Sequence, residues 1–379
     1  MDLATSIRLT YTIASILVLT VYLLPSLRSR FLAYGPRTAS PASSSPPSSG
    51  TTSAEREKAA AARANRNPSP VTSLLDRLAE WKVPHSWFTS FYAVSIFWSL
   101  FWAVQFACKG WVFRVLVDWQ LHDPVTHPER QDRMVYSMTL RQVFLAWGMV
   151  FVQGCRRFWE CLALPQSPSK SQMWIGHWVL GIGFYTGLSV AVWVEGAPLL
   201  ASHTFSLADF AVPPPSFRTF LSLLLFILAS GFQHDCHAYL CSLKSPSSST
   251  TTNKDNDYSS SSSPSSGKPK DSYKLPTHPA FTHLIVPHYT AECLLYLSLA
   301  FLAAPAPHPQ SPTTAGARAQ AAGRGSVFNY TLLAACIFVV VNLGFTAQGT
   351  REWYLVRFGG SPEGRELVER RWRLVPGVW

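Results

Sequence analysis

Charged side chains lie close together at residues 156–160, where Arg-Arg-Phe-Trp-Glu follows directly on an apolar run. Glu160 comes three residues after Arg157 and four after Arg156, so in a helix the three share one face and can form an ion pair. Charged groups within an apolar segment are costly and invite a functional hypothesis. The alternative is a helix end whose arginines extend to the membrane surface. The residues alone do not choose between the two.

A second polar group, Gln233-His234-Asp235-Cys236-His237, ends another apolar run and is followed by Lys244. His234 and His237 share a helical face at a spacing of three residues. Two histidines beside a cysteine suggest a metal site, but the spacing supplies no third ligand, so the signal for zinc is weak. We expect a hydrogen-bonded polar helix end here and no metal.

Two further groups of residues could take part in chemistry. His288 and Glu292 lie one helical turn apart where an apolar run begins. A carboxylate there either needs a partner or a water-filled cavity or complements the dipole of a helix start. Near the end of the chain, Arg351, Tyr354 and Arg357 alternate with aromatic residues. Such a cluster suits a phosphate-bearing ligand, and equally an aromatic belt at a membrane surface.

The elements that must position these residues are apolar segments of roughly 20 residues, long enough to cross a bilayer as helices. We therefore predict an all-α membrane protein with about seven transmembrane helices in a single bundle. Three connectors, 38–70, 245–273 and 305–326, are rich in Ser, Pro, Ala or Gly and are expected to be disordered. The seven predicted spans are 7–27, 87–108, 141–163, 173–194, 217–243, 283–304 and 327–356.

These segments divide the chain into two parts. Residues 1–86 are expected to hold the first transmembrane helix and a disordered cytosolic linker. Residues 87–379 are expected to form a helical membrane domain with disordered loops at 245–273 and 305–326. Gly181, Gly183 and Gly187 do not form a GxGxxG loop after a strand, so they predict close helix packing and not a Rossmann fold.

The net charge of +11 could indicate nucleic-acid binding, but the basic residues are concentrated in connectors. With seven spans, 23 Lys and Arg residues fall on the side that holds the C-terminal tail and six on the other. This asymmetry predicts a cytosolic C-terminus and no nucleic-acid partner. The seven cysteines show no CxxC spacing, so we expect no disulfide framework. The sequon at Asn329 would then face the lumen.

The order of these motifs resembles the steroid 5α-reductase family, most closely its branch that acts on polyprenal. Residues 83–92 (Val-Pro-His-Ser-Trp-Phe-Thr-Ser-Phe-Tyr) are similar to the VPxxWFxxFY segment of that branch, and residues 156–161 to its RRxxEC. The end of the fifth apolar segment, the Pro-His-Tyr-Thr-Ala-Glu run at 287–292, and Trp353-Tyr354 with Arg357-Phe358 complete the match. The resemblance covers the ordered parts from about 83 to 379.

The resemblance implies a seven-helix bundle in the endoplasmic reticulum membrane that binds NADPH from the cytosolic side. It implies reduction of the α,β double bond of polyprenal to dolichal, in the dolichol synthesis that supports protein N-glycosylation. The expected partners are a long-chain polyisoprenoid substrate and membrane lipid, with no protein partner. Carried over by position, the cofactor-binding residues are Arg157, Gln233, His237, Lys244, His288, Glu292, Arg351, Tyr354 and Arg357. The catalytic candidates are Glu160, His288, Glu292 and Tyr354.

Two departures from the family pattern bear on this expectation. His237 and His288 stand where steroid-reducing relatives have Asp and Asn, which argues against 3-oxo-5α-steroid 4-dehydrogenase activity. Arg351 replaces a His that relatives carry three residues before the Tyr; Arg could still bind a cofactor phosphate there. A membrane methyltransferase acting on isoprenoids with S-adenosylmethionine, and a non-enzymatic lipid carrier or scaffold, remain as alternatives.

Overall fold

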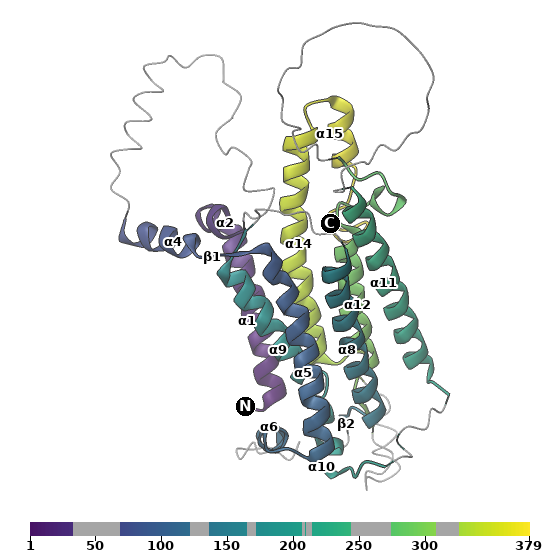
Figure 1. Ribbon diagram of the computed structural model, residues 1–379. Helices are drawn as coiled ribbons and strands as arrows, with labels where there is room; N and C mark the ends of the chain where they lie inside the picture. Colours follow the sequence, from purple (N-terminus) through teal and green to yellow (C-terminus); the bar gives the residue numbers. More distant parts are fainter. Residues whose placement is uncertain are drawn as a thin grey trace, which may run out of the picture.

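A computed structural model of the protein describes residues 1–32, 69–121, 136–164, 172–206, 209, 214–243, 274–307 and 326–379. These residues are mostly helical, and the long helices run side by side as one elongated bundle (Figure 1). A helix lies in each of the seven segments predicted from the sequence. They are α1 (Leu3–Leu23), α5 (Thr89–Cys108), α8 (Leu140–Ala163), α9 (Ile175–Ala191), α11 (Phe217–Ser242), α12 (Pro287–Leu302) and α14 (Tyr330–Phe358).

Five stretches of helix are long and apolar enough to cross a membrane by length and composition: Leu3–Leu23, His85–Cys108, Ile175–Ser202, Phe217–Ser242 and Tyr330–Phe358. The helix α12 is not among them because its 16 residues span only about 24 Å at 1.5 Å per residue. The helix α8 ends in the polar group around Glu160. The prediction of a helical membrane protein is thus supported, whereas the count of seven spans is not confirmed.

Short elements close the two ends of the bundle. The helices α2 (Pro25–Phe31), α4 (Pro70–Glu80) and α15 (Pro362–Glu369) lie at one end, and α6 (Trp111–Leu121) and α10 (Ala197–Ser202) at the other (Figure 1). Strand β1 (Lys82–Pro84) pairs antiparallel with β3 (Gln172–Trp174), so that Val83 faces Met173. Strand β2 (Tyr136–Ser137) pairs with β4 (Ala306–Pro307). The 3₁₀ turns are η2 (His85–Phe88), η3 (Val194–Gly196) and η5 (Pro279–Phe281).

Local sequence explains where the helices of the site begin. The first turn of α8 is closed by a capping box in which Thr139 and Gln142 bond to each other's backbone N–H groups. Ser216 caps α11 through the N–H of Thr219. The first residue of α12 is Pro287, whose fixed φ and missing N–H suit that position. With these starts fixed, the polar ends of α8 and α11 and the start of α12 meet near one end of the bundle.

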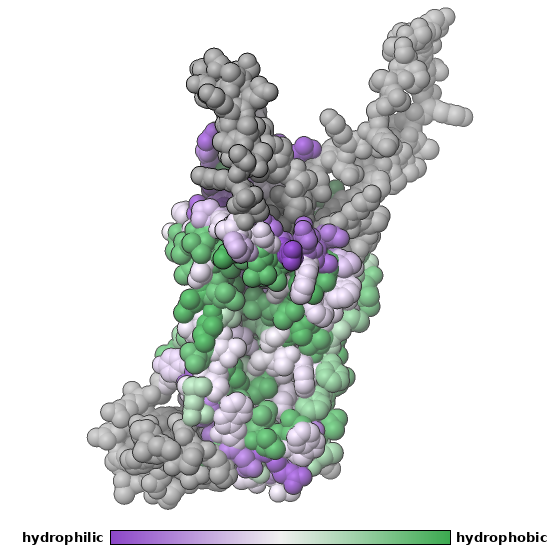
Figure 2. Space-filling view, turned by 90° about the vertical axis from the view of Figure 1, so that its left-hand side faces the viewer, coloured by the Kyte–Doolittle hydropathy of each residue, from purple (hydrophilic) through white to green (hydrophobic). Residues whose placement is uncertain are grey.

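Apolar side chains fill the bundle and also cover much of its outside. The main core is rich in aromatic residues, with Trp102, Phe113 and Trp193 almost fully buried. On the outer face, large apolar side chains such as Ile13, Phe97 and Ile227 are exposed. Figure 2 shows this apolar surface between more hydrophilic ends. An apolar outer surface of this extent fits a bundle surrounded by lipid.

Several predictions fall on other parts of the chain. Lys244, the predicted disordered loop at 245–273 and nearly all of the connectors at 38–70 and 305–326 lie outside the described residues. The division at residue 86 stays a prediction. Asn329 of the sequon is completely buried at the start of α14.

Candidate functional site

Glu160 is the centre of a buried polar network. Its side chain is only 1% exposed, and its two carboxylate oxygens accept hydrogen bonds from Arg156 and Arg157. Two histidines of α11 also lie against the carboxylate: His234 Nδ1 lies 2.8 Å from Oε1, and His237 Nδ1 lies 3.0 Å from Oε2. The ion pair expected from the spacing within α8 therefore forms, and it is shared with a second helix.

The two histidine rings differ in what faces Nδ1. His234 Nδ1 faces the Glu160 carboxylate, which only accepts hydrogen bonds, so this ring carries a proton on Nδ1. His237 Nδ1 lies 3.0 Å from the carboxylate and 2.7 Å from Nη1 of Arg157, so it contacts an acceptor and a donor at once. Within the described parts of the chain, no group of three or more His, Cys, Asp and Glu residues is arranged to hold a metal ion. The contacts to Glu160 account for both histidines of the HxxH pattern.

Gln233 extends the network from α8 and α11 to α12. Its Oε1 accepts from Arg156 and, at 3.0 Å, from Nε2 of Gln153. Its Nε2 donates to a carboxylate oxygen of Glu292. Two arginines and two carboxylates thus lie in one largely buried chain of hydrogen bonds, and their formal charges balance. This balance lowers the cost of burying each charge, although Nε of Arg156 is buried without a hydrogen-bond partner.

His288 adds a donor or acceptor without a partner. Its ring lies 5.3 Å from that of His237, centroid to centroid. Its Nδ1 is buried and has no hydrogen-bond partner in the structure. A buried polar atom without a partner is costly and points to a group that binds there. The structure therefore brings together six residues predicted from the sequence: Arg157, Glu160, Gln233, His237, His288 and Glu292.

Three tyrosines continue this network toward the interior of the bundle. The hydroxyl of Tyr92 accepts hydrogen bonds from Nε and Nη2 of Arg157, at 3.2 and 3.0 Å. The guanidinium also lies 4.9 Å from the centre of the Tyr92 ring. Tyr185 and Tyr296 share a hydrogen bond beside it. The three rings line an inner cavity of about 10 Å³, which has room for about one water molecule.

In the sequence, Tyr92 is notable only as the last residue of the motif at 83–92, and no role is predicted for it. An Oη that accepts two hydrogen bonds from an arginine still has its own O–H to donate. A hydroxyl that donates in this way, next to the positive charge of Arg157, is suited to stabilise a negative charge that develops on a bound substrate. No pattern in the sequence separates Tyr92 from the other aromatic residues of α5. Its distinguishing feature is the contact with an arginine 65 residues away.

Tyr354 lies in a neighbouring cluster and does not bond to the Glu160 network. It is buried with Ile285, Val286, Ala347 and Val368, between α14, the start of α12 and α15. Arg351 donates through Nη2 to the carbonyl of Glu369, at 3.3 Å. Arg357 is exposed in the last turn of α14. These three predicted residues thus lie in the last turns of α14, at the same end of the bundle as the Glu160 network but outside it.

Arg371 is a further candidate that the sequence did not single out. It is only 6% exposed and lies near Tyr354 and Tyr239. Nη2 donates to the carbonyl of Pro276 at 3.1 Å, whereas Nε and Nη1 have no partner in the structure. Burial lowers the pKa of the Arg371 guanidinium. Two unpartnered donors on a buried guanidinium are suited to an anion such as phosphate.

The chain is similar to several reductases of known name. It is 21% identical over 231 residues to polyprenal reductase of Mesocricetus auratus. The matched region is 58% of this chain and 63% of the relative. It is 22% identical over 261 residues to polyprenal reductase 1 of Oryza sativa subsp. indica, covering 62% of each. It is 28% identical over 159 residues to polyprenal reductase of Xenopus laevis, covering 42% and 43%.

These matches span between 43% and 63% of the length of the three relatives. No protein-family model matches the chain. The similarity supports the resemblance seen in the motifs.

Proposed function

We propose that the chain is an NADPH-dependent oxidoreductase that reduces the α,β double bond of polyprenal to give dolichal. The observation that carries the proposal is the buried network in which Glu160 joins α8 to α11 and Gln233 joins both to Glu292 of α12. Six residues that resemble family site residues meet there. The relatives named above are polyprenal reductases, which supports the same reaction class.

The residues present fit a phosphate-bearing cofactor. The unpartnered Nε and Nη1 of Arg371 are suited to a phosphate. Arg351 and Arg357 add positive charge on the neighbouring stretch of α14. His237, Gln233 and His288 would contact the remainder of the cofactor from α11 and α12. When bound, NADPH supplies the hydride.

The chain's own part in the reaction is to stabilise charge and to deliver a proton. When the β-carbon of the enal accepts a hydride, the electron pair of the double bond shifts and negative charge develops on the aldehyde oxygen. We propose that the O–H of Tyr92, whose oxygen accepts from Arg157, donates to that oxygen of the substrate. The α-carbon then gains a proton, for which His288 and Tyr354 are the candidate sources, and dolichal results.

The setting of the reaction completes the proposal. A polyisoprenoid substrate would reach the site from the bilayer, because large apolar side chains are exposed on the outside of the bundle, as on the face in Figure 2. We place the protein in the endoplasmic reticulum membrane with its C-terminus in the cytosol, where NADPH is available. In that location it would serve dolichol synthesis and so protein N-glycosylation.

The decisive test is an assay of membranes that contain the full chain, with polyprenal and NADPH. We expect NADPH-dependent formation of the α-saturated aldehyde. Its absence from protein that is monodisperse after solubilisation would overturn the proposal. Parallel reactions with a 3-oxo-steroid and NADPH, or with S-adenosylmethionine and an isoprenoid, identify the two alternative activities.

Glu292→Ala tests the place of the network within that reaction. We expect this variant to be expressed like the wild type but to lose turnover, since Gln233 would lose its acceptor on α12. Near-normal activity in this variant would remove Glu292 from the site.

A further inference from the structure

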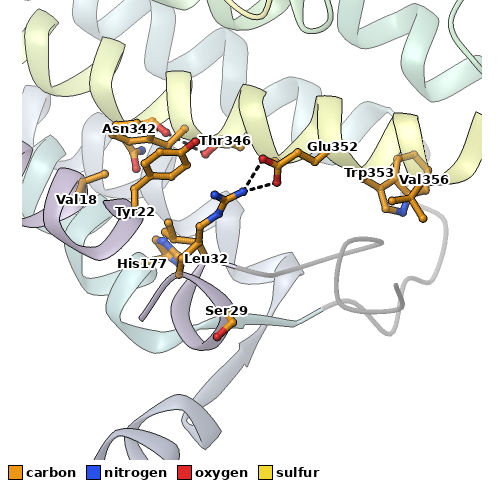
Figure 3. Close-up of a pocket in the computed structure, with 13 residues that line it drawn as sticks. Val18, Tyr22, Ser29, Leu32, His177, Asn342, Thr346, Glu352, Trp353 and Val356 are labelled. Carbon is orange, nitrogen blue, oxygen red and sulfur yellow. Dashed lines mark hydrogen bonds and ion pairs between the residues drawn. The ribbon is translucent and has the colours of Figure 1, made fainter. Parts of the chain in front are cut away.

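A second cavity lies apart from the polar network. Its volume is about 290 Å³, and it lies between α1 and α2 on one side and α14 on the other, with His177 of α9 at its wall (Figure 3). None of its lining residues belongs to the Glu160 network. Its walls are partly apolar, with Val18, Leu32 and Phe345, and partly polar, with Ser29 and Asn342.

The cavity holds one positive and one negative side chain on opposite walls. Arg28 of α2 bonds to both carboxylate oxygens of Glu352 on α14, as the dashed lines in Figure 3 show. The guanidinium is held in place from behind, 4.7 Å from the centre of the Tyr22 ring. The carboxylate also accepts from Nε2 of Gln348 at 2.8 Å. The two side chains are 37% and 42% exposed, so a ligand can reach them.

The charges exclude most simple ions as ligands. An anion alone would meet Glu352, and a cation alone would meet Arg28. A zwitterion with a phosphate and an ammonium group matches both, with the phosphate on Arg28 and Ser29 and the ammonium on Glu352. Trp353 also lines the cavity, and the face of an aromatic ring suits a quaternary ammonium.

The size of the cavity agrees with a lipid headgroup. Pockets for small ligands have volumes of about 300–1,000 Å³, so a cavity of 290 Å³ suits a small headgroup. A phosphocholine group is of that size, whereas a dinucleotide cofactor is several times larger.

The depth of the cavity also agrees with a lipid. The candidate span of α1 ends at Leu23, so Arg28 and Ser29 lie just beyond it, where headgroups are found. Leu19 and Leu23 are exposed in the last turns of α1 and would contact the acyl chains.

We propose that the cavity between α2 and α14 binds the headgroup of one zwitterionic phospholipid of the phosphatidylcholine type. The lipid opens the Arg28–Glu352 ion pair and replaces each partner with its own opposite charge. It thereby joins α2 to α14 at the surface of the membrane. This site is independent of the reductase proposal, because it uses none of the same residues.

The test measures the thermal unfolding of the full chain, purified in detergent, with two lipids that have identical short chains. We expect dihexanoyl phosphatidylcholine to raise the midpoint by several degrees and dihexanoyl phosphatidylglycerol to raise it clearly less. In the double variant Arg28→Gln/Glu352→Gln this difference should disappear. The matched control is Arg365→Gln/Glu369→Gln, which removes an exposed ion pair of α15 and should keep the difference.

Several outcomes would overturn the proposal. Equal shifts with the two lipids would mean that lipids bind without headgroup recognition, and an unchanged difference in the double variant would place the site elsewhere. Free phosphocholine that stabilises as well as the lipid would identify a soluble ester as the occupant. If the double variant does not fold, Thr346→Met provides a second test, because its longer side chain would extend into the cavity. We expect this variant to lose the difference between the two lipids. A difference that persists in Thr346→Met would contradict the proposal.

Discussion

The carboxylate of Glu160 on α8 lies 3.0 Å from Nδ1 of His237 on α11. The two residues are 77 positions apart, and both side chains are largely buried. Nη1 of Arg157 lies 2.7 Å from the same ring nitrogen, so the three side chains form one cluster. The contact links the arginine pair of α8 to α11, which carries His237 and Gln233 among the proposed cofactor contacts.

Replacing Glu160 with Gln should destabilise the protein and abolish turnover. The substitution leaves Arg156 and Arg157 without their buried counter-charge, and breaking such a pair costs about 3–5 kcal/mol. Thermal unfolding and the polyprenal assay measure the two effects. The control is Glu195→Gln, which breaks the Arg8–Glu195 ion pair away from the network. It should lose stability but keep its activity per folded molecule; equal loss of activity in both variants would contradict a role for Glu160 beyond folding.

Tyr92→Phe removes the proposed donor to the aldehyde oxygen without changing the shape of the side chain. Loss of one such donor lowers kcat by about 10²–10³-fold, and we expect KM for polyprenal to change little. Tyr11→Phe is the matched control, because Tyr11 is also buried and donates only to the carbonyl of Phe184, at 3.1 Å. A Tyr92→Phe enzyme with wild-type kcat would show that the hydroxyl does not contact the reacting oxygen.

How much of this site the sequence predicts differs from residue to residue. Helical spacing alone pairs Glu160 with Arg156 and Arg157, and the structure confirms this. The contacts of Glu160 with His234 and His237 depend on how α8 packs against α11, and local spacing contains no such information. The apolar runs likewise predict where the helices lie, but not that Gln233 joins three of them.

Two residues escape sequence reasoning for different physical reasons. Tyr92 is one of many aromatic residues in an apolar segment, where lipid contact and core packing favour the same residue types. Arg371 is one of three arginines within residues 370–373. Only burial distinguishes it, since its two neighbours Arg370 and Arg373 are not in the buried set.

Arg371→Gln should weaken cofactor binding more than it slows the chemical step. Each hydrogen bond to a charged group contributes about 1.5–3 kcal/mol, which corresponds to roughly a 10–100-fold rise in Kd. Titration of the purified protein with NADPH, followed by fluorescence, measures this directly. Arg365→Gln on the exposed face of α15 is the control and should bind as the wild type does. Unchanged affinity in Arg371→Gln would exclude a phosphate contact by this residue.

The sequon at Asn329 should carry no glycan, whichever side of the membrane it faces. Asn329 is completely buried, its Oδ1 accepts from the N–H of Leu332, and its Nδ2 donates to the carbonyl of Ala303 at 3.3 Å. The amide nitrogen that would be modified is therefore inside the fold. Endoglycosidase treatment of protein from a glycosylating host should leave its mobility unchanged. Asn329→Ala should instead lower stability by about 0.5–2 kcal/mol through loss of the helix cap, and a mobility shift on deglycosylation that this variant abolishes would show that α14 begins differently.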